Sequence, residues 1–221
     1  MKFRHEYKHQ INLSDVYRLR TRLSAVAKHD THADEDGTYF IRSLYFDNYM
    51  DKALREKIDG VNKREKFRIR YYGTDTSFIR LEKKSKINGL CNKISCRITA
   101  EECQKIIDGD IEFLISGKHE LMRELYVKMK YQLLRPKCIV AYTRECFVYP
   151  PGNVRVTLDM NICGSNNVGE FLNPDLPFLQ TYRDSILEVK WDEYLPQIIR
   201  DCVQVKSRRS VAFSKYAAVR I

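Results

Sequence analysis

The sequence predicts an α+β protein built on a large antiparallel sheet of about eight strands. Three observations lead to this fold class. Short segments that alternate apolar and polar residues recur along the chain, as is typical of strands with one buried face. Turn residues join several of these segments directly, which favours antiparallel neighbours. The 221 residues, 43% of them hydrophobic, are enough for one packed core, so we expect a single domain over residues 1–221.

The first elements are predicted from periodicity and capping. Residues 3–12 alternate and predict a strand. Ser14 then caps a helix whose apolar residues recur at helical spacing as far as Val26. A second strand is predicted over residues 39–46. A short helix over residues 51–58 ends at an Asp-Gly pair.

The middle of the chain predicts three consecutive strands and a capped helix. Gly73-Thr74-Asp75 and Asn88-Gly89 are turn sequences, and they separate strands predicted over 65–72, 77–84 and 90–98. Thr99 and Glu102 match a capping box that opens a short helix ending at Ile107.

The last third alternates one long helix with three strands. The helix is predicted over residues 119–134 and is closed by Arg135-Pro136. Further strands are predicted over 138–149, 154–161 and 185–192, and a helix follows Pro196.

Charge is distributed unevenly. The chain carries 39 Lys and Arg against 29 Asp and Glu, a formal net charge of +10. Residues 52–97 alone hold 14 Lys and Arg and 5 Asp and Glu. A polyanionic partner is the first interpretation, and nucleic acid, an anionic membrane and a phosphate-rich small molecule remain open on charge alone.

Two exclusions narrow the class of protein. No apolar run approaches the roughly 18 residues that cross a bilayer, and no signal-peptide pattern opens the chain, so we expect a cytoplasmic protein. The seven cysteines form an odd set without metal-ligand spacing. We expect them to be buried apolar side chains in a reducing compartment.

The strand faces carry the chemical signal. Side chains two residues apart share a face, so Lys66, Arg68 and Arg70 lie together opposite an apolar face. The same alternation groups Arg80 with Glu82 and Lys84, and the other strands group Arg4 with Glu6 and Lys8, Arg155 with Thr157 and Asp159, and Glu188 with Lys190; Arg144 stands alone. These faces either meet water or turn inward.

The inward alternative makes a specific prediction. If the strands close into a barrel, opposing Lys and Arg line a tunnel with a few carboxylates. Buried like charges at that density require a polyanion. The carboxylates would then suit Mg²⁺ or Mn²⁺, which bridge phosphates. Aromatic residues alternate away from the arginines, which disfavours a nucleic-acid site.

Seven motifs, in order along nearly the whole chain, resemble the VTC domain, the polyphosphate polymerase domain of the vacuolar transporter chaperone family within the triphosphate tunnel metalloenzyme superfamily. They are Arg-His-Glu-Tyr-Lys (4–8), Ile-Arg-Ser-Leu-Tyr-Phe-Asp (41–47), Lys-Phe-Arg-Ile-Arg (66–70), Leu-Glu-Lys-Lys-Ser-Lys (81–86), Tyr-Thr-Arg-Glu (142–145), Leu-Glu-Val-Lys (187–190) and Ser-Lys-Tyr (214–216).

The resemblance implies an eight-stranded antiparallel β tunnel barrel with flanking helices. The activity it implies is a phosphotransferase that uses a divalent metal, Mn²⁺ or Mg²⁺, to extend inorganic polyphosphate from ATP. With the strand-face argument, it assigns three groups of residues. They are a catalytic group of Arg68, Arg70, Lys84, Arg144 and Lys190, a substrate-binding group of Lys8, Arg42, Lys66, Arg80 and Lys215, and metal-binding acids Glu188, Glu6 and Glu82.

Two other functions stay open. One is a tripolyphosphatase or nucleoside triphosphatase of the same fold, and the other is a non-catalytic module that binds polyanions. One departure from the wider superfamily favours the polymerase: Arg4 stands where those proteins open with Glu. An arginine at this position would favour the binding of phosphate groups over the binding of a metal ion.

Overall fold

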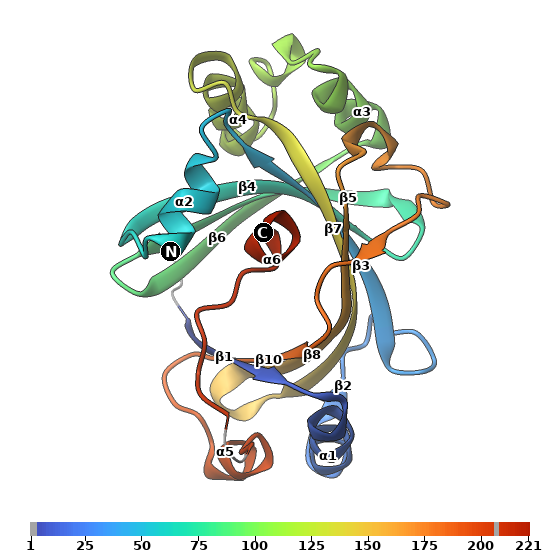
Figure 1. The fold of residues 1–221 in the computed structure, drawn as a ribbon, viewed down its shortest axis with the longest axis vertical. Coiled ribbons are helices and arrows are strands. Elements are labelled where there is room, and N and C mark those ends of the chain that lie inside the picture. The colour runs from blue at the N-terminus through green and yellow to red at the C-terminus, as the bar shows by residue number, and fades with distance from the viewer. Residues whose placement is uncertain (1–3, 206–207) are drawn as a thin grey trace.

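Eight long strands form one antiparallel sheet that curls around on itself (Figure 1). The computed structural model describes residues 4–205 and 208–221. The strand order is β1-β10-β8-β7-β3-β4-β5-β6, and every neighbouring pair is antiparallel. The strands are β1 (His5–Ile11), β3 (Thr38–Asp47), β4 (Lys63–Tyr72), β5 (Asp75–Ile87), β6 (Leu90–Ile98), β7 (Arg135–Tyr149), β8 (Val154–Ser165) and β10 (Ser185–Trp191).

The predicted fold class is confirmed, with one refinement at the seam of the barrel. The two edge strands, β1 and β6, approach each other at one isolated bridge, between Arg4 and Cys91. Among the described residues, these two strands share no continuous ladder of backbone hydrogen bonds. The short strands β2 (Lys28–His29) and β9 (Leu179–Gln180) pair with β7 and β8 and were not predicted. The predicted start of the first strand at residue 3 lies outside the described residues.

Helices cover two parts of the outer face (Figure 1). Those over β4, β5 and β6 shield an apolar cluster that includes Phe67 and Ile69, and those over β8 and β10 shield a second cluster that includes Leu158 and Val189. The first group comprises α3 (Ala100–Asp108) and α4 (Glu120–Tyr131), and the second comprises α1 (Leu13–Ser24) and α5 (Gln197–Cys202). The alternation of β4 therefore sends its apolar side chains outward and its cations inward.

The helix caps were predicted with mixed success. Thr99 and Glu102 form the predicted capping box of α3. The cap of α1 is Asn12, whose side chain accepts from the backbone of Asp15, so the prediction of Ser14 as the cap was wrong by two residues. Asn12 is the cap because the Asp15 carboxylate in turn accepts a hydrogen bond from the Asn12 backbone amide, which completes a capping box.

A sixth helix, α6 (Lys215–Arg220), lies inside the curled sheet, and the sequence did not predict it (Figure 1). Its Tyr216 stacks on Tyr45 at 5.3 Å between ring centroids and donates a hydrogen bond to Asp47 at 2.7 Å. Asp47 also accepts from backbone amides at the start of α2 (Lys52–Ile58). One buried carboxylate thus ties α2 and α6 to the sheet.

All seven cysteines are free thiols; four of them are buried, as expected, and Cys91, Cys163 and Cys202 are half-buried. Across residues 4–205 and 208–221, no helix combines the length and apolarity that spanning a membrane would require.

Candidate active site

The cations of β4 point into the space that the sheet encloses. Arg68 contacts Glu82 of β5 at 2.7 Å and donates to the Tyr45 hydroxyl at 3.1 Å. Arg70 is buried and donates to Ser43 at 2.9 Å and to the Tyr142 hydroxyl at 3.0 Å. The hydrogen-bond partners of Arg70 are therefore neutral hydroxyls, whereas Arg68 pairs directly with the Glu82 carboxylate.

Glu188 is the most heavily surrounded carboxylate. It lies on β10 with its side chain 7% exposed, and it contacts Lys190 at 2.7 Å, Lys8 at 3.2 Å and Arg144 at 3.9 Å. Burial alone would raise the pKa of Glu188, but the cations, Lys190 first, hold that pKa well below its ordinary value. Glu188 is thus an ionised acid with three cations around it.

Glu6 of β1 completes this group. Its carboxylate contacts Lys84 at 3.1 Å and Lys8 at 3.6 Å. Burial opposes ionisation, yet Lys8 and Lys84 outweigh it and lower the pKa of Glu6 to about 2. The pKa of Lys190 is lowered as well, to about 8, because burial outweighs the attraction of Glu188; this shift favours the neutral amine, whereas that of Glu6 favours the carboxylate.

Asp159 of β8 belongs to the site, although the sequence analysis did not select it. It is fully buried, it accepts two hydrogen bonds from Arg144 at 2.6 and 2.8 Å, and it contacts Lys215 of α6. The sequence did contain a pattern that could have identified it, because Asp159 shares a predicted strand face with Arg155 and Thr157.

Lys66 and Tyr45 form a pair without a carboxylate. Lys66 donates to the Ser214 hydroxyl at 3.4 Å and lies 5.5 Å from the centre of the Tyr45 ring. Burial lowers the pKa of Lys66 to about 7. Burial would raise the pKa of Tyr45, but Arg68, Lys66 and Arg70 outweigh it and lower that pKa to about 7. Tyr45 and Tyr142 are site residues that the sequence analysis missed.

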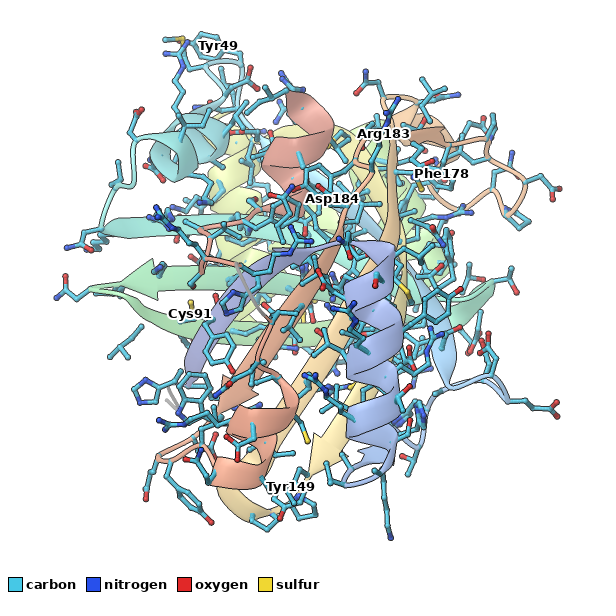
Figure 2. All side chains as sticks on the ribbon, turned by 60° about the horizontal axis from the view of Figure 1, so that its bottom comes forward. Tyr49, Cys91, Tyr149, Phe178, Arg183 and Asp184 are labelled. Atoms are coloured by element: carbon cyan, nitrogen blue, oxygen red, sulfur yellow. The ribbon has the colours of Figure 1, made fainter. Side chains whose placement is uncertain are left out.

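Arg42 does not join the other cations. On β3 it is Ser43 and Tyr45 that face the interior, so Arg42 lies on the opposite face of the strand. Its guanidinium donates to the carbonyls of Phe171, Asn173 and Pro174. It also lies 5.1 Å from the ring of Phe178, which Figure 2 labels on the loop before β9. Arg42 therefore anchors that loop, and we remove it from the predicted substrate-binding group.

Two further predicted residues lie at the margins of the site. Arg80 shares its face of β5 with Glu82, lies opposite Arg70 and covers the ring of Phe78 at 5.4 Å. Arg4 contacts Asp192 at 2.9 Å, so its charge is already balanced. Arg4 therefore gives no reason to favour a polymerase over a hydrolase.

Glu6 and Glu188 fit a divalent cation, and Glu82 stands apart from them. The two carboxylates flank the Lys8 ammonium group and both are ionised. Glu82 is instead held by Arg68 and by Lys93 at 3.1 Å. In the described parts of the chain, no three His, Cys, Asp or Glu side chains gather into a ligand set. Mg²⁺ commonly uses one or two carboxylates, with water and substrate phosphates completing its shell. The pair therefore suits a cation that binds with its substrate.

Comparisons with known proteins identify the family and the fold. The family profile described as VTC domain matches residues 3–220. No curated protein matches the chain. HpAC1 from Hippeastrum, described as an adenylyl cyclase candidate with a dominant triphosphatase activity, superposes with a TM-score of 0.60 at 15% identity and covers 100% of this chain and 95% of its own.

Two other solved structures share the fold. The PH1012 protein of Pyrococcus horikoshii gives a TM-score of 0.56 at 14% identity and covers 98% of this chain and 99% of its own. An adenylate cyclase candidate from Bacillus halodurans gives 0.55 at 15% identity, with 86% and 80% covered. At these identities the likeness shows the curled antiparallel fold alone.

Proposed function

The chain belongs to the VTC domain family, and we propose that it is a metal-dependent polyphosphate polymerase that transfers the γ-phosphoryl group of ATP to a growing inorganic polyphosphate chain. The charge of the interior carries the proposal. In the group described above, eight cations lie with four carboxylates: Lys8, Lys66, Arg68, Arg70, Lys84, Arg144, Lys190 and Lys215 with Glu6, Glu82, Asp159 and Glu188. A chain of phosphates would neutralise this shielded surplus.

The proposed reaction needs no protein nucleophile. An oxygen of the terminal phosphate of the acceptor attacks the γ-phosphorus of ATP and forms a new P–O bond. The bond to the β–γ bridging oxygen breaks, and ADP leaves with that electron pair. Phosphoryl transfer depends on positioning and on charge neutralisation more than on covalent chemistry.

The cations have different roles in this proposal. Arg70 offers a guanidinium whose present partners are neutral hydroxyls, so it suits the transferring phosphoryl group. Lys84 and Lys190 act as mobile point charges. A divalent cation bound by Glu188 and Glu6 would neutralise and orient phosphate oxygens.

The test is incubation of the purified protein with ATP and Mn²⁺, followed by separation of long-chain polyphosphate from free phosphate on a gel. We expect a ladder of polymer that is lost in EDTA. ADP and free phosphate without polymer would instead identify a triphosphatase, the activity described for the Hippeastrum protein. Binding of tripolyphosphate without any turnover would indicate a non-catalytic module.

A further inference from the structure

A second group of cations lies beside the interior set. Lys57 of α2, Arg64 of β4 and Lys86 of β5, hereafter the outer cation row, line a cavity of about 290 Å³ that also reaches Lys66. Arg64 and Lys86 are directly opposite each other across β4 and β5. Because alternate residues share a face, Arg64 continues the line of Lys66 and Arg68 along one strand. That line spans about 13 Å at the usual rise per residue.

The outer cation row has no acidic partner within the described residues. Lys57 donates to the carbonyl of Ala212, and Arg64 donates to that of Val61. Glu65, which lines the same cavity, pairs with Lys128 of α4 instead. The row therefore differs from the interior lysines Lys8, Lys84, Lys190 and Lys215, each of which contacts a carboxylate.

Like charges crowd this cavity. Burial lowers the pKa of Lys57, and the charges of Arg64, Lys8 and Lys86 lower it further. A row of half-buried cations without counter-charges carries repulsion that a bound anion would relieve. The cavity connects this row to Lys84 and Glu6, so one extended anion can contact both groups.

We propose that the outer cation row is a second phosphate-binding site, which holds the acceptor polyphosphate several phosphates away from its reacting end. The proposal rests on the proposed function and names the acceptor class: a long linear polyphosphate rather than a short one. A triphosphate held by Arg68 and Arg70 is too short to engage the row as well. The row therefore favours continued extension of a chain already bound.

The experiment compares three proteins: wild type, the triple variant Lys57→Gln, Arg64→Gln and Lys86→Gln, and a control that removes the same charge from exposed positions, Arg18→Gln, Lys28→Gln and Lys118→Gln. Calorimetric titration measures the binding of tripolyphosphate, long-chain polyphosphate and a single-stranded oligonucleotide of matched charge. The length of the product made from ATP and Mn²⁺ is read on a gel.

We expect the triple variant to bind the long chain roughly tenfold more weakly, because it loses three phosphate contacts, and to bind tripolyphosphate almost as well as wild type. Its products should be shorter, and the control should behave as wild type. Equal losses for both phosphate ligands, equal losses in the control, or a larger loss for the oligonucleotide would overturn the proposal. Wild type that binds the long chain selectively but makes no polymer would refute the proposed function and leave the site in place.

Discussion

Arg144 and Asp159 form a two-contact ion pair inside the curled sheet, at 2.6 and 2.8 Å. They are directly opposite on β7 and β8, and the Asp159 side chain has no exposure to solvent. Burial would raise the pKa of Asp159, but Arg144 and Lys215 outweigh it and lower that pKa to about 2. Since Lys215 belongs to α6, this carboxylate positions a cation of the proposed site and also attaches α6 to the sheet.

The first prediction concerns Asp159→Asn. The variant leaves Arg144 and Lys215 buried beside a neutral amide, and removing one partner of a buried ion pair typically costs about 3–5 kcal/mol. We expect a loss of that order in the free energy of unfolding, measured by urea denaturation. Tripolyphosphate should restore more stability to this variant than to wild type. An Asp110→Asn control at an exposed position should change little. Unchanged stability of Asp159→Asn would show that this pair does not hold α6.

Local alternation explains what the sequence could predict. The inward set of Lys66, Arg68 and Arg70 follows from β4 alone, because one face of that strand is apolar and the other is cationic. The same reasoning fails for Arg42, because β3 has apolar side chains on both faces and is buried on both. Which face of β3 meets the interior depends on its neighbours, β4 and β7.

Tertiary placement explains what the sequence could not predict. In the sequence, Tyr45 and Tyr142 look like ordinary core residues. Only the folded structure shows that they belong to the site, because Arg68 and Arg70 donate hydrogen bonds to their hydroxyls. The helix α6 has six residues, too few for a periodic apolar signal, and its position depends on Asp47 and Asp159 elsewhere in the chain.

The second prediction separates the role of Glu188 from general burial of charge. Glu188→Gln should lower turnover by about a hundredfold or more, because a neutral amide cannot supply the anionic ligand or counter-charge. A titration of activity with Mn²⁺ should show a weaker apparent affinity for the metal, so that half-maximal activity needs more Mn²⁺ than in wild type. Glu145→Gln is the matched control, since Glu145 is also buried but pairs with Arg20 of α1 at 2.8 Å on the outer face. Full turnover of Glu188→Gln with wild-type metal dependence would remove Glu188 from the site.

The third prediction contrasts two buried arginines. Arg70→Ala should reduce turnover by about 10²–10³, as loss of a preorganised charge donor typically does, with a small effect on stability because its partners are hydroxyls. Arg42→Ala should do the reverse: its loop loses three carbonyl contacts, so thermal stability falls while the folded protein keeps its turnover. Arg42→Ala that is stable but inactive would return Arg42 to the site.

The last prediction is a rise of stability with pH. Lys66 and Tyr45 both have a pKa lowered to about 7 in the folded protein, against ordinary values of 10.5 and 10.0. Between pH 7 and 10 the unfolded chain therefore binds more protons than the folded chain at both groups, so the free energy of unfolding increases as pH rises. Because an ionised Tyr45 favours the protonated form of Lys66, the two groups titrate as a pair, and together they contribute about 1.4 kcal/mol per pH unit within that window.

Urea denaturation of wild type, Lys66→Met and the exposed control Lys118→Met at intervals from pH 7 to 9.5 measures this slope. Lys66→Met should be more stable than wild type at pH 7 and should show a shallower rise, because it no longer carries an ammonium group into a buried cationic cluster. Tripolyphosphate should also flatten the wild-type slope, since a bound anion favours the charged form of Lys66. Parallel slopes in all three proteins would mean that Lys66 keeps its proton throughout, and that the interior neutralises this cation without a substrate.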